Sequence, residues 1–250
     1  MQQFDDFADS RLLVGCLYCS AVTDLSEEHA PSRVLLDRPL PDFPPKLQAC
    51  KRCNRGYALD EEYFAAFLGC VLSGSTDPDR QRNERVAAIL AHSPALRARI
   101  EASRSEANGV VTFMPEGERI SRVVQKLAAG HAAYEHSIPQ RSEPSALHWL
   151  PLSALSEEER ESWDAPELFD LWPEVGSRGM QRAAIIQATL RTASGEQVAA
   201  GFVMNDWVTV QEGVYRYHVS SSTSAVRVRM TIREYLACEV IWDEALATGG

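Results

Sequence analysis

The sequence predicts an α+β protein with a helical middle and a β-rich C-terminal part. Two Cys-x-x-Cys pairs occur near the start, at residues 16–19 and 50–53. Apolar residues follow helical spacing over 60–72 and 118–134, whereas β-branched and aromatic residues recur at strand spacing through much of 183–242. The 250 residues, 45% of them hydrophobic, can form a substantial core in one or two domains.

The two cysteine pairs predict a structural zinc site. Each pair can present two thiolates from one tight turn, and four thiolates complete the tetrahedral shell of a structural Zn²⁺, leaving no open position for chemistry. A pair of redox motifs is the other interpretation. Cys70 and Cys238 stand alone in apolar surroundings and are expected in the core. The predicted zinc ligands are Cys16, Cys19, Cys50 and Cys53.

The charge balance limits the possible partners. The chain has 35 acidic and 25 basic residues, a formal net charge of −10, so the whole chain does not attract nucleic acid. A local basic surface would have to supply that contact, and the candidates near the second cysteine pair are Lys46, Lys51, Arg52 and Arg55.

Two further features of the sequence predict the cellular compartment of the protein. The chain has no apolar run of about 18 residues, which excludes a predicted membrane helix. Its acidic first residues lack the pattern of a signal peptide. We therefore expect a cytoplasmic protein, a setting in which paired cysteines bind metal more often than they form disulfides.

A short motif lies between the cysteine pairs. It is Glu27-Glu28-His29-Ala30-Pro31, and Asn54 directly follows the last cysteine. The cysteine pairs, Glu28-His29 and Asn54 together resemble the HNH (ββα-metal) endonuclease family, in the bacterial versions that carry a four-cysteine zinc site. The strong motifs cover residues 16–64, including the acidic segment 60–64. The resemblance implies a zinc-stapled, treble-clef-like ββα-metal module.

The resemblance also implies a role for each matched residue. His29 would be the general base that activates water, a task suited to its near-neutral pKa. Glu28 and Asn54 would hold one Mg²⁺ or Mn²⁺ that contacts the scissile phosphate. Lys46 departs from the family pattern, because it stands where the middle Asn is expected and a lysine has no acceptor to orient a loop.

These roles predict a metal-dependent endonuclease that hydrolyses nucleic-acid phosphodiesters, with DNA favoured over RNA. By resemblance, a bacterial phage-defence effector is a further hypothesis. Two alternatives from other classes stay open. One is a zinc-stapled module that binds nucleic acid without cutting it, and the other is a protein-interaction module whose C-terminal half contacts a partner or a second copy. The ordinary interpretations are an N-cap for Asn54 and a solvated charge for Glu28.

The other segments predict the secondary structure. Residues 25–36 are expected to hold the hairpin of the zinc module, and the prolines at 39–45 an extended loop. A helix that carries Asn54 is expected to start at the second cysteine pair, and apolar residues follow helical spacing from residue 60. The other expected helices are 79–92, 94–105, 118–134 and 157–163. The expected strands are 109–114, 183–192, 200–210, 214–220, 225–230 and 236–242.

Four regions are predicted from these patterns and from the breaks between them. Residues 1–75 form the zinc module, 76–138 a helical segment, 139–180 a connector, and 181–250 a β-rich α+β domain.

Overall fold

The computed structural model describes residues 4, 5, 7–169 and 174–243. The described helices are α1 (Lys51–Ser73), α2 (Glu84–His92), α3 (Pro94–Ala102), α4 (Gly117–His136), α5 (Glu157–Asp164) and α6 (Arg178–Arg182). Short 3₁₀ turns are η1 (Ser10–Leu13), η2 (Arg33–Leu35), η3 (Pro78–Arg80) and η4 (Leu152–Ala154).

The described strands form four separate sheets, so the fold is mixed α+β, as predicted. The first six are β1 (Leu25–His29), β2 (Lys46–Cys50), β3 (Arg104–Ala107), β4 (Val110–Phe113), β5 (Ala146–Pro151) and β6 (Glu167–Phe169). The last six are β7 (Ala184–Arg191), β8 (Gln197–Asn205), β9 (Val208–Gln211), β10 (Tyr215–Ser221), β11 (Ala225–Ile232) and β12 (Leu236–Asp243). The largest sheet is antiparallel in the order β5-β12-β11-β10-β9.

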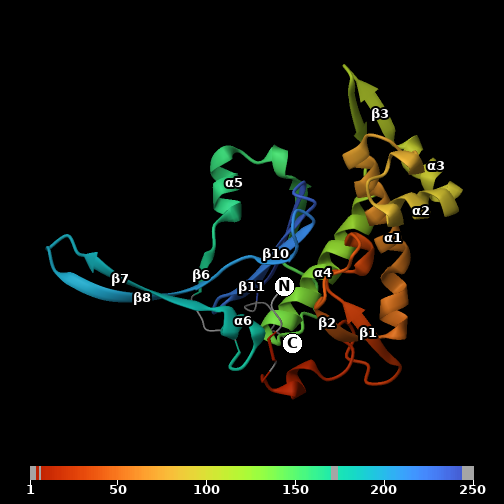
Figure 1. Cartoon of the computed structure of the whole chain (residues 1–250). Coiled ribbons are helices and arrows are strands. Elements are labelled where there is room, and N and C mark those ends of the chain that lie inside the picture. The colour runs from red at the N-terminus through yellow and green to blue at the C-terminus, as the bar shows by residue number, and fades with distance from the viewer. Residues whose placement is uncertain (1–3, 6, 170–173, 244–250) are drawn as a thin grey trace.

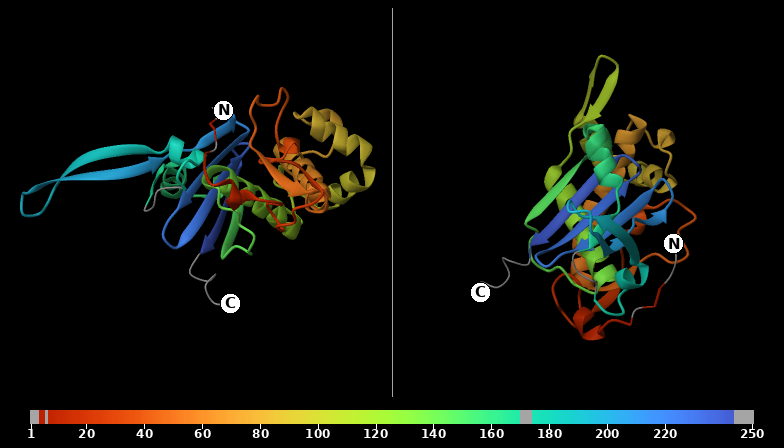
Figure 2. Two further views of the ribbon diagram at one scale, coloured as in Figure 1. Left: turned by 90° about the horizontal axis from the view of Figure 1, so that it is seen from below. Right: turned by 90° about the vertical axis from the view of Figure 1, so that its left-hand side faces the viewer.

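Helix α4 lies between the five-stranded sheet and α1 (Figures 1 and 2). Its second half is rich in alanine and glycine, and every residue from Lys126 to His136 is buried. Small side chains allow neighbours to approach α4 on both sides, so one hydrophobic cluster continues from Leu35 to Trp242. The core therefore joins the hairpin side of the molecule to the C-terminal sheet.

A buried polar group lies where α4 meets the sheet. His131 contacts the Tyr215 hydroxyl through Nε2 at 2.9 Å, and its ring stacks on Tyr217 with a centroid distance of 3.8 Å. Burial lowers the pKa of His131 to about 3, which keeps it neutral. Glu135 accepts a hydrogen bond from the Tyr217 hydroxyl and pairs with Arg182 of α6. The buried carboxylate is thus fully compensated.

One expectation for the N-terminal part was wrong. The hairpin is not contained in residues 25–36, because β1 pairs with β2 at Leu25↔Cys50 through His29↔Lys46. The proline-containing stretch is part of the connection between these strands, and β2 begins directly after it at Lys46. The helix that carries Asn54 begins at Lys51, before the apolar helical spacing that starts at residue 60, because Cys50 caps α1 by accepting a hydrogen bond from the Cys53 amide.

Farther along, the expected elements are found with shifted ends. Helix α3 stops at Ala102, and the next residues form β3, paired with β4. Strand β5 was missed; it joins the edge of the large sheet beside β12. The strands expected between 183 and 242 are found as β7 to β12, with the single expected strand 200–210 divided into β8 and β9, and the short helix at 157–163 is α5.

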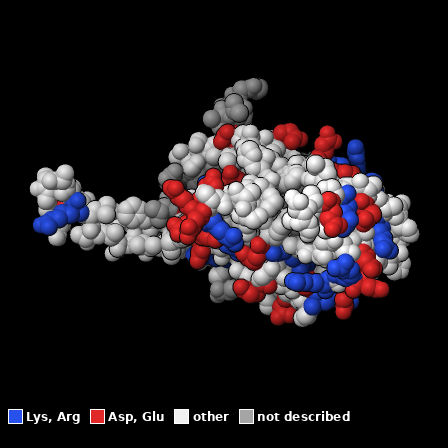
Figure 3. All heavy atoms as spheres, turned by 90° about the horizontal axis from the view of Figure 1, so that it is seen from above, with Lys and Arg blue, Asp and Glu red and all other residues white. Residues whose placement is uncertain are grey.

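Strands β7 and β8 form an arm that extends away from the body (Figures 1 and 2). β7 is an edge strand, since the order of this sheet is β6-β8-β7. The arm exposes Ile185 to 61%, with Ile186, Leu190 and Val198 also exposed. Figure 3 shows little charge along it except near its tip. Arg191 ends β7 and Glu196 directly precedes β8, on either side of the turn that joins the two strands.

Candidate metal centre and histidine site

Four cysteine sulfurs form a cluster that could hold a metal ion such as zinc. The Sγ atoms of Cys16, Cys19, Cys50 and Cys53 all lie within 4.8 Å of one another. A tetrahedron with Zn–S bonds near 2.3 Å separates its sulfurs by about 3.8 Å. The distance from Cys19 Sγ to Cys50 Sγ is 3.7 Å. The donor set and its spacing therefore fit a four-thiolate zinc centre.

Local backbone geometry forms the first cysteine turn. The Cys16 amide donates to the Ala21 carbonyl at 2.7 Å, and the Ser20 amide donates to the Cys16 carbonyl at 3.0 Å. Gly15 precedes this turn with φ +82°, and a Cβ at this position would lie 2.9 Å from the Ala21 carbonyl oxygen. A glycine is required there by both the backbone angle and the close approach.

The second cysteine pair begins α1. The Cys53 amide donates to Cys50 Sγ at 3.4 Å, and the Tyr18 amide makes the equivalent contact with Cys16 Sγ at 3.4 Å. The hydrogen bond from the Cys53 backbone is the main reason that the pKa of Cys50 falls to about 7. A thiol with such a pKa is readily deprotonated, as a metal ligand must be.

His29 ends β1 on one face of the hairpin. Its Nε2 lies 2.8 Å from the Arg33 guanidinium and 3.2 Å from the Glu27 carboxylate. Lys46, its cross-strand partner, pairs with the other Glu27 oxygen at 3.0 Å. The His29 side chain is 11% exposed. Burial, followed by the charge of Arg33, lowers the pKa of His29, so its imidazole is neutral at pH 7.

Glu28 faces the opposite way, because adjacent residues of a strand point to opposite faces. It is 3% exposed, and its carboxylate lies 2.7 Å from the ammonium of Lys126 on α4. The same ammonium contacts Glu61 of α1 and lies 3.1 Å from the Ser32 hydroxyl. Burial raises the pKa of Glu28, and Lys126 acts in the other direction. Two carboxylates thus share one buried cation.

Gly130 lies one turn beyond Lys126 on α4. A Cβ at this position would be 2.7 Å from the Ala30 Cβ, so the helix touches the chain immediately after His29. Contact this close fixes the distance between α4 and the end of β1.

Asn54 lies in the first turns of α1 and contacts β1. Its amide nitrogen is 3.3 Å from both the Ser26 hydroxyl and the Glu27 carbonyl oxygen. Asn54 therefore connects the start of α1 to β1, but no described hydrogen bond joins it to His29 or to the Glu28 carboxylate. The side chains of Lys51, Arg52 and Arg55 are exposed beside it and make no hydrogen bond or ion pair with another described residue.

The divalent-ion site implied by the sequence resemblance does not fit the Glu28 carboxylate in this arrangement. An ammonium already lies at hydrogen-bond distance from it and from the next carboxylate, Glu61. Sequence reasoning missed Lys126 and Glu61. Lys126 could have been noticed because it lies three residues after Val123 and next to Leu127, on the apolar side of the predicted helix.

Comparison with protein-family models, with curated proteins and with solved structures found no match. Among the described residues, no helix combines the length and apolar character needed to cross a membrane.

Proposed function

We propose that the chain is an HNH-type endonuclease that hydrolyses nucleic-acid phosphodiesters, DNA in preference to RNA. One observation carries the proposal: the four-cysteine cluster joins the β1–β2 hairpin to the start of α1, and His29 ends the same hairpin beside two cations. A strand hairpin followed by a helix, with one cysteine pair before the hairpin and one where the helix begins, has the parts expected of a zinc-stapled ββα module.

The side chains around His29 support hydrolysis at a phosphate. Neutral His29 takes a proton from the attacking water as general base. Arg33 and Lys46 supply positive charge for the phosphate and for the charge that develops on it. Arg33 now contacts His29 Nε2, so it must turn toward the phosphate before that nitrogen can accept a proton. The exposed cations Lys51, Arg52 and Arg55 extend this basic surface along α1.

The resemblance further implies a catalytic Mg²⁺ or Mn²⁺ held by Glu28 and Asn54. Lys126 occupies the cation position at Glu28, so we derive no step through such an ion and assign Glu28 to the interior of the module. The nuclease assay below therefore includes arms with Mg²⁺, with Mn²⁺ and with a chelator for divalent ions.

The test is plasmid nicking by the full-length protein. We expect His29→Ala to lower the cleavage rate by roughly 10²–10⁴-fold, the usual effect of losing a general base. Zinc content should stay at the parental value, because His29 is not one of the four clustered cysteines, and circular dichroism should show the variant folded.

The matched control is His92→Ala, which removes an exposed histidine at the end of α2. Cleavage by this variant should equal that of the parent. Equal cleavage by His29→Ala and the parent would contradict the assignment of His29.

A second candidate function is nucleic-acid binding without cleavage by the same zinc-stapled module. The neutralised Glu28 and the lysine at position 46 favour it. If the parent binds DNA in a mobility-shift assay but never nicks it under any metal condition, this second function replaces the first.

For the partner of the C-terminal half, we propose self-association through the arm. The exposed edge of β7 leaves backbone groups available for another strand, and its exposed apolar residues favour burial. Arg191 is the only charged residue of β7. Two copies of this strand can therefore pair antiparallel without placing a row of like charges opposite one another.

We expect the sedimentation coefficient to rise with protein concentration in the parent. Ile186→Lys should keep the protein monomeric, because a charge on an edge strand opposes pairing. Met114→Lys places the same charge at an exposed apolar site outside the arm and should sediment like the parent. A parent that stays monomeric at all concentrations, or an Ile186→Lys variant that associates as the parent does, would exclude this surface.

A further inference from the structure

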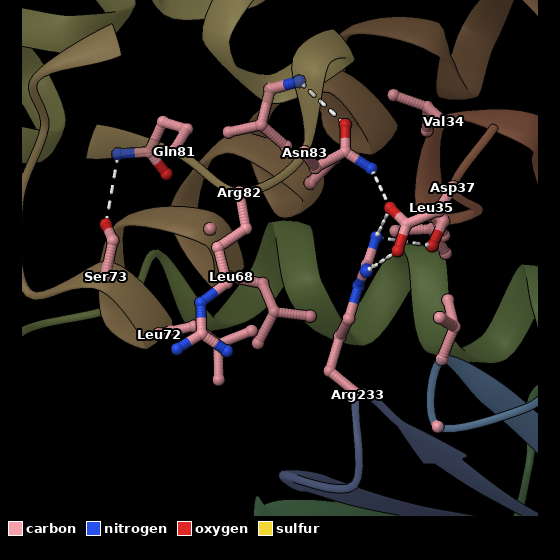
Figure 4. Close-up of a pocket in the computed structure, with 15 residues that line it drawn as sticks. Val34, Leu35, Asp37, Leu68, Leu72, Ser73, Gln81, Arg82, Asn83 and Arg233 are labelled. Atoms are coloured by element: carbon pink, nitrogen blue, oxygen red, sulfur yellow. Dashed lines mark hydrogen bonds and ion pairs between the residues drawn. The ribbon is translucent and has the colours of Figure 1, made fainter. Parts of the chain in front are cut away.

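A cavity of about 300 Å³ lies apart from the hairpin, between η2, α1, α2 and the turns that follow β9 and β11 (Figure 4). Its apolar lining comes from four parts of the chain, and includes Leu35, Ala65, Leu68, Leu72, Val86 and Val214. Small-molecule sites in proteins begin at about this volume and are mostly apolar, with a few polar groups that orient the ligand.

The single acidic side chain in the described lining is neutralised. Asp37 accepts two hydrogen bonds from Arg233, at 2.6 and 2.9 Å, and another from the Asn83 amide. The Arg233 hydrogen bond is the main cause that lowers the pKa of Asp37. Because the Asn83 side-chain oxygen in turn caps α2, this group of three residues is a fixed part of the wall.

Arg82 is the cation in the lining that has no partner. Its side chain is exposed and makes no hydrogen bond or ion pair with another described residue. In Figure 4 its guanidinium reaches past Leu68 toward Leu72. The described lining therefore offers apolar side chains and one available guanidinium, while its one carboxylate is already paired.

We propose that this cavity binds a small monocarboxylate with an apolar body, its carboxylate at Arg82 and its body against Leu68, Leu72 and Val86. A guanidinium binds a carboxylate through two parallel hydrogen bonds, which orients such a ligand. A cavity of about 150 Å³ already holds benzene, so 300 Å³ accepts a longer chain or a larger ring. The lining includes no aromatic ring, which favours an aliphatic body. This proposal is independent of the proposed nuclease function.

The experiment uses three probes with one tail: octanoate, 1-octanol and octylammonium. Each is titrated to about 5 mM, the range of weak ligands, into full-length protein with labelled leucine and valine methyl groups. We expect octanoate to shift the methyl signals of Leu68, Leu72 and Val86 in a saturable way. Octanol should bind more weakly, and octylammonium should not bind, because it meets the Arg82 charge.

Two variants decide whether the guanidinium matters. Arg82→Gln should weaken octanoate binding about tenfold, the effect of one lost charge-assisted contact. Arg80→Gln removes an exposed cation two residues away, outside the lining, and should bind octanoate like the parent. The proposal is overturned if octanoate shifts none of these methyl signals, if octylammonium shifts them equally, or if Arg82→Gln binds octanoate as tightly as the parent.

Discussion

Cys16→Ser and Cys53→Ser will each remove the bound metal and unfold the β1–β2 hairpin. The apolar cluster around the cysteines is small: Cys16, Ala49 and Cys50, with a few partly buried neighbours. We expect so small a cluster to leave much of the ordering of the cysteine loops to metal binding. A structural zinc contributes about 10–16 kcal/mol in small zinc-dependent domains, the largest effect expected for any single change here.

The measurement combines zinc content by mass spectrometry with amide hydrogen exchange. We expect about one zinc per parental chain, and fast exchange in β1 and β2 when either cysteine is replaced. Cys70→Ser is the matched control, because Cys70 is buried in α1 outside the four-sulfur cluster and should leave the zinc content unchanged. A parental protein that binds no zinc would contradict the prediction, as would full protection of the hairpin in Cys16→Ser.

Lys126→Met will lower the free energy of unfolding by about 3–5 kcal/mol. The substitution keeps the length of the side chain but leaves Glu28 and Glu61 without the cation between them, which is the usual cost of breaking a buried ion pair. Urea unfolding followed by circular dichroism measures the change. Arg122→Met, one turn earlier on α4, is the control: Arg122 is 57% exposed where it pairs with Asp60, and its loss should cost about 0–1 kcal/mol.

The loss in free energy of unfolding caused by Lys126→Met should also depend on pH. Burial raises the pKa of Glu28 in the folded state, and removing Lys126 removes a charge that opposes this rise. A carboxyl whose folded pKa is raised stabilises the fold below its unfolded pKa and loses that contribution as pH rises through the folded pKa. The free energy of unfolding of the variant should therefore be closest to that of the parent in mild acid and furthest from it above neutral pH. An equal deficit at all pH values would show that the carboxylates are not the cause.

Features that depend on residues close together in the sequence could be predicted. Contacts between residues far apart in the chain could be predicted less well. Cysteine spacing predicted the metal cluster, and the spacing of apolar residues predicted α4 and the late strands. The pairing of β1 with β2 could not be predicted, because the partner of His29 lies beyond a connection whose prolines indicate only loop. The cysteine pair predicted a helix that carries Asn54, but the apolar spacing indicated helix only from residue 60, since the first turns of α1 are mostly polar.

The candidate site was predicted only in part for the same reason. Glu28 and His29 are adjacent in the sequence, yet the strand sends them to opposite faces. Glu28 therefore belongs to a buried group completed by α1 and α4, whereas His29 belongs to a partly exposed group with Glu27, Arg33 and Lys46. Only tertiary contacts, which span up to 98 residues between Glu28 and Lys126, distinguish these two environments.

The contact at Gly130 limits how this chain can vary over generations. Alanine at that position would place its Cβ 2.7 Å from the Ala30 Cβ, so α4 could not keep its distance from the residue that follows His29. Displacing α4 there would also move its opposite side, where His131 stacks on Tyr217. Position 130 therefore does not accept a larger side chain, although Gly130 takes no part in the proposed metal site or catalysis. Substitutions in the C-terminal sheet must also keep α4 at the distance from Ala30 that this glycine permits.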